Sequence, residues 1–374
     1  MNYFKFTLLI FIIALVSISC KKELRPYKIE KNSAASGLKY AKGFEIQHFK
    51  DYKKVIIKAP YKGAKETFEF ILRTSKTTVK NEINIPINSI VVTSTTHIPF
   101  IELLNEQEKI VGFPNTNFIS SPKTRKLIDD NKLKELGHPE NINTETLVAL
   151  NPDVVIGFSL TSNNKMFNII EQIGIPVILN GDWLEETPLG RAEWIKFYGV
   201  LFNKEKEADS IFNSIEKNYL EAVKIAKKSK EKPTLLAGGL FKDVWYLPAG
   251  DSFEATFLRD ANVNYLWNEF KGKGSLALNI ESVFEKGKNA SIWISPSFHE
   301  SLKELEETNA IYSQFKAFQT QNIYSYMKTK GATGGIIYFE LSPTRPDFVL
   351  KDLIKIAHPE LLKDYEFTFY KKLN

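Results

Sequence analysis

The sequence predicts an α/β protein of two lobes with mainly parallel sheets flanked by helices, joined by a long rigid helix and preceded by a small antiparallel β extension. Three observations support this fold. Short β-branched runs alternate with helical stretches on both sides of a long helical tract. Residues 43–73 instead alternate as antiparallel strands joined by turns do. The composition, 43% hydrophobic and 25% charged, is that of a globular chain.

The chain begins with a segment typical of an export signal. Lys5 precedes an apolar run over 6–18, which is shorter than the roughly 20 residues of a membrane-spanning helix and suits a signal peptide. Small residues then precede Cys20, the only cysteine of the 374 residues, in an order that resembles a bacterial lipobox. We expect residues 1–19 to be removed and a lipidated Cys20 to hold the protein on a membrane, facing the periplasm or the cell surface. The alternative is an uncleaved anchor with an incidental cysteine.

A polar tether and a β extension follow the leader. We expect the tether over 20–40, because this stretch is polar and charged and contains the short run Ser-Ala-Ala-Ser-Gly. The β extension is expected over 41–87, with Gly and Pro between its strands at 59–63. Its strands are expected at 44–49, 54–58 and 67–72.

The first lobe is expected over 88–186. Its short apolar runs, rich in Val and Ile, suit strands that are buried on both faces of a parallel sheet. The strands are expected at 89–93, 109–113, 153–157 and 176–180, and the helices at 99–104 and 166–172.

A helical tract separates the first lobe from the second. Thr187 and Pro188 supply an N-cap and a first-turn proline. We assign 187–203 to the interlobe helix and 204–374 to the second lobe, which begins with a long helix. The other expected elements of the second lobe are strands at 234–238, 291–295, 322–326 and 336–339 and a C-terminal helix at 347–356.

The two lobes repeat one local pattern. Asn143 and Asn279 each stand where a helix N-cap is expected, and Glu145 and Glu281 each fall in the first helical turn. A short helix, a breaker and a buried strand follow in both places. Helix capping and the helix dipole explain either copy alone, but not the same exposed carboxylate at equivalent places in both lobes.

Together, 89–97, 109–112, 143–156 and 279–284 resemble the iron–siderophore/cobalamin family of ABC-transporter substrate-binding proteins, here in a lipoprotein form. The resemblance covers about residues 88–360. It implies two lobes joined by one rigid helix, with the ligand between them. It also implies one glutamate on each lobe that docks onto arginines of the membrane permease, at Glu145 and Glu281. The β extension lies outside the family pattern.

Candidate ligand contacts lie in loops, because ligands of open α/β sheets bind beyond the carboxyl ends of the strands. Aromatic residues there offer flat surfaces suited to a macrocycle or a catecholate, and Arg345, with Arg191, suits ligand carboxylates. Instead of contacting ligand, the tryptophans could pack in the core, and His97 could cap a helix or form a structural hydrogen bond. The candidates are Thr96, His97, Asn117, Phe158, Trp183, Trp245, Tyr246 and Arg345.

The sequence contains only incomplete matches to catalytic motifs, and its histidines lack the spacing of metal ligands. Residues 157–161 approach the G-x-S-x-G elbow but lack its last glycine, and 271–275 is not a P-loop. The five histidines show no metal-binding spacing. The net charge of +6 is too small to suggest nucleic acid.

We therefore expect a monomeric, lipid-anchored substrate-binding subunit of an ABC importer, with no intrinsic cofactor. Its ligand is expected to be an iron–siderophore, cobalamin or haem-type chelate, and its partners a permease dimer with its ATPase. Two alternatives stay open. An α/β enzyme would turn over substrate without a transporter, and a surface adhesion or structural lipoprotein would have a closed cleft.

Overall fold

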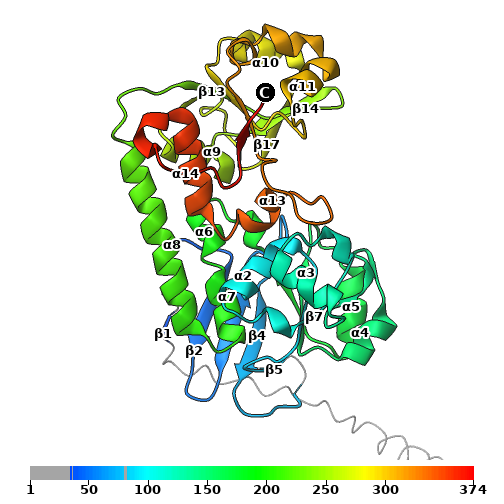
Figure 1. Cartoon of the computed structure of the whole chain (residues 1–374). Helices are drawn as coiled ribbons and strands as arrows, with labels where there is room; N and C mark the ends of the chain where they lie inside the picture. Colours follow the sequence, from blue (N-terminus) through cyan, green and yellow to red (C-terminus); the bar gives the residue numbers. More distant parts are fainter. Residues whose placement is uncertain (1–33, 36, 80–81) are drawn as a thin grey trace, which may run out of the picture. The chain divides into compact units, whose positions relative to one another are not determined.

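The computed structural model describes residues 34–35, 37–79 and 82–374, and it confirms the mixed α/β architecture with parallel sheets flanked by helices (Figure 1). The expected leader, Cys20 and most of the tether lie outside the described residues. Within the described ranges, no helix combines the length and the apolar character needed to cross a membrane.

The β extension forms a five-stranded sheet. Its strands are β1 (Ala34–Ala35), β2 (Phe44–His48), β3 (Lys53–Ile57), β4 (Phe68–Arg73) and β5 (Glu82–Asn84). β2, β3 and β4 pair antiparallel as expected. β1, which lies in the segment expected to be a tether, also pairs antiparallel to β2, and β5 pairs parallel to β4. Phe44, Val55 and Ile57 are buried in the same hydrophobic cluster as the first lobe. The extension is therefore packed into the core of that lobe.

The N-terminal lobe is built on a parallel sheet in the order β12 (Val177–Asn180), β11 (Val154–Phe158), β6 (Ile90–Val92), β7 (Ile110–Phe113) and β8 (Lys134–Glu135). All three residues of β6 are buried, as the apolar run predicts. A hairpin of β9 (Gly137–His138) and β10 (Asn141–Ile142) follows β8. The helical elements are η1 (Thr95–His97), α2 (Ile98–Leu103), η2 (Gln107–Lys109), η3 (Thr116–Phe118), α3 (Pro122–Asp129), α4 (Thr144–Leu150), α5 (Lys165–Gln172) and η4 (Asp182–Leu184).

The helix that joins the lobes lies later than expected. Residues 187–203 form two short helices, α6 (Pro188–Ala192) and α7 (Ile195–Leu201), and not the single interlobe helix. The next helix, α8 (Glu205–Ala226), has 22 residues, or about 33 Å at 1.5 Å per residue. Its Phe212 packs in the N-terminal cluster and its Tyr219 in the C-terminal cluster. The connecting helix is therefore α8.

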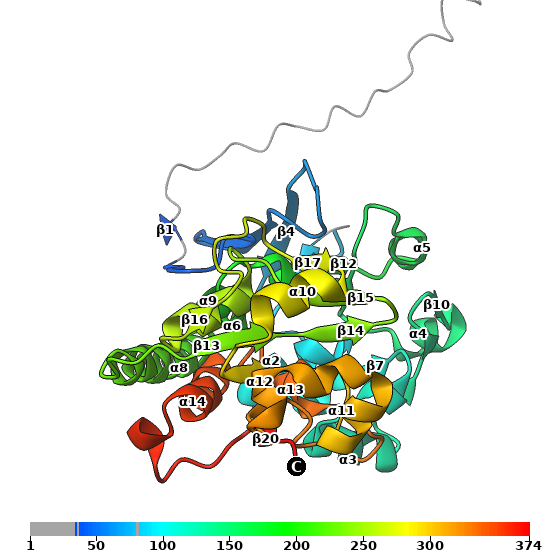
Figure 2. The same cartoon turned by 90° about the horizontal axis from the view of Figure 1, so that it is seen from above.

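The C-terminal lobe has two sheets. The larger has the order β16 (Asn264–Tyr265), β13 (Thr234–Ala237), β18 (Ile292–Ile294), β19 (Ile323–Ser325) and β20 (Lys371–Lys372), with only β20 antiparallel. The smaller is the antiparallel sheet β14 (Gly239–Phe241), β15 (Val244–Pro248) and β17 (Ser275–Leu278). The helical elements are α9 (Phe253–Asp260), α10 (Ile280–Gly287), α11 (Leu302–Thr308), η5 (Ala310–Gln314), α12 (Lys316–Gln319), α13 (Ile337–Leu341), α14 (Pro346–Ala357) and η6 (Pro359–Leu362). Helix α14 packs along α8 (Figures 1 and 2).

The strand expected at 336–339 is wrong, because this run forms helix α13. Tyr338 is buried and stacks on Tyr326 with ring centroids 5.2 Å apart. Helix α13 also contacts α2 and η1 of the N-terminal lobe. These tertiary contacts outweigh the strand preference of Ile and Tyr.

Candidate ligand-binding pocket and docking helices

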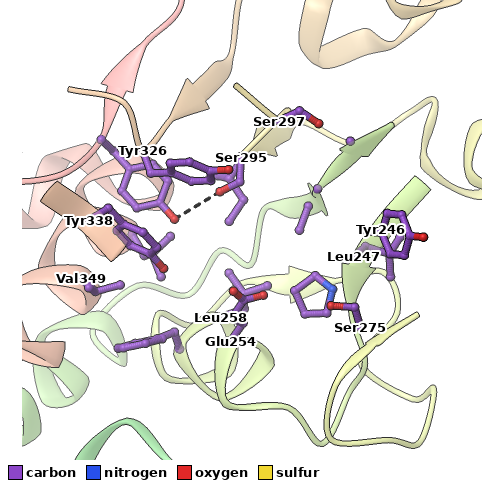
Figure 3. Close-up of a pocket in the computed structure, with 18 of the residues that line it drawn as sticks. Tyr246, Leu247, Glu254, Leu258, Ser275, Ser295, Ser297, Tyr326, Tyr338 and Val349 are labelled. Atoms are coloured by element: carbon purple, nitrogen blue, oxygen red, sulfur yellow. Dashed lines mark hydrogen bonds between the residues drawn. The ribbon is translucent and has the colours of Figure 1, made fainter. Parts of the chain in front are cut away.

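A pocket of about 290 Å³ lies in the C-terminal lobe, at the carboxyl ends of β13, β18 and β19 (Figure 3). This is the edge where open α/β sheets bind ligands. The residue at the end of β13 is Gly238, with φ at +78°, and a Cβ there would lie 1.9 Å from the Tyr246 carbonyl oxygen. Only glycine lets the chain turn so close to β15. The polar or aromatic residues that line the pocket are Phe241, Tyr246, Glu254, Phe257, Ser275, Ser295, Ser297, Phe298, Tyr326, Tyr338, Phe339 and Tyr370.

Aromatic rings form much of the pocket wall. Tyr326 lies directly after β19, stacks on Tyr338 and meets Phe339 edge-on at 5.1 Å. Phe241 and Phe298 also line the pocket, although their side chains are 63% and 62% exposed. Burial raises the pKa of Tyr326 to about 12 and that of Tyr338 well above its usual value. Both phenols are therefore neutral hydrogen-bonding groups at physiological pH.

Glu254 is the one carboxylate among the described residues that line the pocket, and no lysine, arginine or histidine stands among them. It occupies the first turn of α9, which Ser252 caps by accepting a hydrogen bond from the Ala255 N–H at 3.1 Å. Glu254 is exposed in the open pocket, while desolvation by the surrounding walls raises the pKa of its carboxyl and the charge of Arg191 acts in the opposite direction. The described residues hold no group of three His, Cys, Asp or Glu side chains placed to bind a metal ion.

The guanidinium of Arg191 lies at the junction of the lobes without lining the pocket. It donates to the Trp183 carbonyl oxygen at 2.8 Å and lies 3.6 Å from the centre of the Phe253 ring, on α9. Burial lowers the pKa of Arg191, an effect that nearby Asp182 and Glu254 oppose. Arg191 thus joins the Trp183 loop to the helix that carries Glu254.

The predicted caps of α4 and α10 are confirmed. The side-chain oxygen of Asn143 accepts from the Thr146 N–H at 2.9 Å, and that of Asn279 accepts from the Ser282 N–H at 2.8 Å. Glu145 and Glu281 are exposed in the first turns of these helices. Neither glutamate forms an ion pair with another described residue.

Comparison with known proteins assigns the chain to a family and a fold. A family model described as periplasmic binding protein matches residues 90–329, well over half of the chain. The chain belongs to the periplasmic binding protein family. Proteins of this family and fold bind solutes, and the match confirms the resemblance that the sequence predicts.

Relatives of this periplasmic binding protein include two uncharacterized lipoproteins of Methanocaldococcus jannaschii. One is 26% identical over 368 residues, which cover 90% of this chain and 85% of that lipoprotein. The other is 26% identical over 304 residues, covering 78% of this chain and 75% of that lipoprotein.

Three solved structures share the fold. An ABC transporter substrate-binding protein of Listeria monocytogenes is 19% identical with a TM-score of 0.54, covering 73% of this chain and 99% of its own. The periplasmic haem-binding protein of Vibrio cholerae is 15% identical with a TM-score of 0.55, covering 70% and 99%. The periplasmic vitamin B12-binding protein of Vibrio cholerae is 12% identical with a TM-score of 0.52, covering 75% and 99%.

Of the eight candidate contacts, Tyr246 lines the pocket of this periplasmic binding protein and the other seven do not. Trp245 is fully buried, stacks on Trp293 and donates to the Ala237 carbonyl oxygen at 3.1 Å. Neighbouring residues of a strand point to opposite faces, so β15 turns Tyr246 toward the pocket and Trp245 into the core.

Arg345 already has partners within the protein. Its guanidinium makes two hydrogen bonds to Asp347, at 2.9 and 2.8 Å, and lies 3.4 Å from the centre of the Phe348 ring. Both the charge and the flat face of Arg345 are already engaged.

The N-terminal candidates lie outside the pocket. His97 is fully buried, neither ring nitrogen has a hydrogen-bond partner among the described residues, and burial lowers its pKa to about 3. It is therefore neutral and shielded from solvent. Phe158 and Trp183 meet edge-on at 5.9 Å, while Thr96 is half-buried and Asn117 exposed.

Sequence reasoning missed Glu254, Tyr326 and Tyr338. Tyr326 was the last residue of the strand expected at 322–326, whereas β19 ends at Ser325, so the expected loop began one residue too late to include it. Tyr338 was assigned to a strand that is a helix. In sequence, Glu254 looks like any other acidic residue in a first helical turn.

A buried carboxylate links the lobes beside the pocket. Glu340 of α13 accepts the Ser120 N–H at 2.8 Å and the Ser121 N–H at 2.9 Å. The segment before it lies close to the same loop, because a Cβ on Gly331 would lie 2.6 Å from the Cα of Ser120. Burial raises the pKa of Glu340 from 4.5 to about 7.

Glu340 is expected to make stability fall as the pH rises. Since its folded-state pKa is raised, its contribution is complete below about pH 4.5 and is lost as the pH passes about 7. Between about pH 5 and about pH 8, the wild type should lose on the order of 2 kcal/mol relative to Glu340→Gln in urea unfolding. Glu135→Gln is the control, because hydrogen bonds lower the pKa of Glu135 and its contribution changes only at lower pH. If the free energy of unfolding changes with pH equally for the wild type and Glu340→Gln, the raised pKa of Glu340 is wrong.

Proposed function

We propose that this protein is the lipid-anchored substrate-binding subunit of an ABC importer. It binds a metal chelate of the iron–siderophore, cobalamin or haem type and delivers it to a permease dimer with its ATPase. The observation that carries the proposal is the aromatic pocket at the carboxyl ends of β13, β18 and β19 in a member of the periplasmic binding protein family.

The ligand class is supported by the pocket wall and by proteins of the same fold. The rings of Tyr246, Tyr326 and Phe339 line the cavity, and aromatic rings suit the planar or macrocyclic parts of chelates. The proteins of like fold named above bind haem and vitamin B12.

Export and anchoring are supported by the leader and by the relatives. The apolar run and Cys20 have the order of a lipoprotein signal, and two relatives are named lipoproteins. Lipidation at Cys20 would place the pocket outside the cytoplasm and close to the permease. We further propose that 20–40 is a tether and that the protein acts as a monomer.

Delivery is assigned to the exposed pair Glu145 and Glu281. They occupy equivalent positions on capped helices, one in each lobe. A permease of two similar subunits would offer one basic site to each glutamate.

The test of ligand binding is a titration of the mature protein with a ferric trihydroxamate, cobalamin and haem. At least one should raise the melting temperature, since a ligand at about 100 times its Kd stabilises a protein by about 2.7 kcal/mol. Ser275→Trp fills the pocket from β17, where Ser275 is exposed, and should abolish the shift. If none of the three binds, or if Ser275→Trp binds as the wild type does, the assignment is wrong.

A further inference from the structure

The described residues that line the pocket carry negative charge and no positive charge. The described lining residues supply one carboxylate, from Glu254, together with neutral hydroxyls such as those of Ser275, Ser295 and Tyr326. No lysine, arginine or histidine of the described chain lines it. A ligand anion in this cavity would meet no cationic side chain.

Glu254 itself is unpartnered. Figure 3 shows its carboxylate directed into the pocket, next to Leu258. It forms no hydrogen bond or ion pair with another described residue. A first-turn glutamate needs only an exposed position to favour the helix dipole, by about 0.3–1 kcal/mol. Glu254 has such an exposed position, and the same exposure to the open pocket leaves its carboxylate accessible to a ligand.

The positive charge of Arg191 does not make the pocket favourable to anions. Its guanidinium is held by the Trp183 carbonyl oxygen and the Phe253 ring, and it is buried away from the cavity. The ionisable groups that act on it include three carboxylates, those of Asp182, Glu185 and Glu254. The surroundings of the pocket therefore favour cations over anions.

We propose that Glu254 selects the charge of the transported ligand. The pocket takes a neutral or positively charged chelate, whose ammonium or amide N–H group binds the Glu254 carboxylate while its apolar part packs on the tyrosines. Chelates with several negative charges are rejected, because they would face an unpaired carboxylate. This inference rests on the proposed function and narrows its ligand class.

Three probes of nearly equal size test the selection. They are ferrioxamine B, a ferric trihydroxamate that ends in a free ammonium group, its N-acetyl derivative and its N-succinyl derivative. The free end of the probe is then cationic, neutral or anionic. The wild type should bind the cationic probe about tenfold or more tightly than the anionic one, because opposite and like charges near Glu254 differ by more than 1.4 kcal/mol.

Glu254→Gln keeps the size of the side chain and removes its charge, so it should reduce the preference to less than about threefold. Glu285→Gln changes an exposed glutamate of α10 outside the pocket, and it should keep the wild-type preference. An unchanged preference in Glu254→Gln would overturn the inference.

Anionic chelates separate this inference from the proposed function. Haem and a ferric tricatecholate should bind more weakly than the ammonium probe. Should the wild type prefer either of them, charge selection is wrong while the importer assignment stands. Failure to bind any of these chelates, or cobalamin, would overturn both the charge selection and the importer assignment.

Discussion

Replacing Glu145 or Glu281 by arginine is expected to abolish uptake while leaving folding and ligand affinity close to wild type. Both glutamates are exposed, and both helices keep their asparagine caps in the variants. The lost dipole interaction is only about 0.3–1 kcal/mol. In the complex, each new arginine would instead face a basic site of the permease. We expect this to weaken association by a few kcal/mol, or about 100-fold.

The measurement is uptake of the bound chelate by cells that carry each variant at wild-type levels, together with the affinity of the purified variants for the permease. Glu207→Arg is the matched control, since Glu207 is an exposed first-turn glutamate of α8. It should transport normally. If Glu145→Arg or Glu281→Arg transports at the wild-type rate, that glutamate is a helix-stabilising residue and nothing more.

Replacing Glu193 by leucine is expected to destabilise the protein by about 3–5 kcal/mol. The Glu193 carboxylate is fully buried and accepts the N–H groups of Lys39 (2.9 Å), Tyr40 (2.7 Å) and Ala41 (2.9 Å). Leucine would leave three partly buried N–H groups without an acceptor, each costing about 1–3 kcal/mol. The start of the β extension would then lose its attachment to the N-terminal lobe.

Urea unfolding followed by tryptophan fluorescence checks this expectation. Glu216→Gln is the comparison, because Glu216 binds side chains of the same segment, Lys39 Nζ and the Tyr40 hydroxyl, both at 2.7 Å. Since the Lys39 contact is exposed and the Tyr40 contact only partly buried, the loss should stay below about 1 kcal/mol. Equal losses for the two variants would show that the buried carboxylate does not hold the segment.

The parts of the fold that could be predicted are those fixed by local pattern. The apolar runs of β6 and β11 are buried on both faces, and a run of this kind has few alternatives. The Asn143 and Asn279 caps follow from a side chain that satisfies a free N–H group within three residues. Such features depend on nearby residues and can be read without the tertiary structure.

The remaining features depend on contacts between distant residues. Residues 337–341 have a strand-like composition, yet they form a helix where Tyr338 stacks on Tyr326 and Glu340 reaches Ser120. Trp245 and Tyr246 have similar character in the sequence, and only the pairing of β15 decides which of them faces the pocket. The charge selection proposed for Glu254 likewise depends on tertiary structure, because it is the folded chain that leaves no lysine, arginine or histidine among the described lining residues.

Native mass spectrometry of the protein purified from its own host tests the central claim most directly, that a metal chelate binds in the pocket of the C-terminal lobe. Wild-type protein from cells supplied with chelate should carry one small molecule that contains a metal, in a one-to-one complex. Ser275→Trp, which fills the pocket, should appear at the mass of the protein alone. A wild-type protein without any bound molecule, or an equal amount of adduct on Ser275→Trp, would contradict the claim.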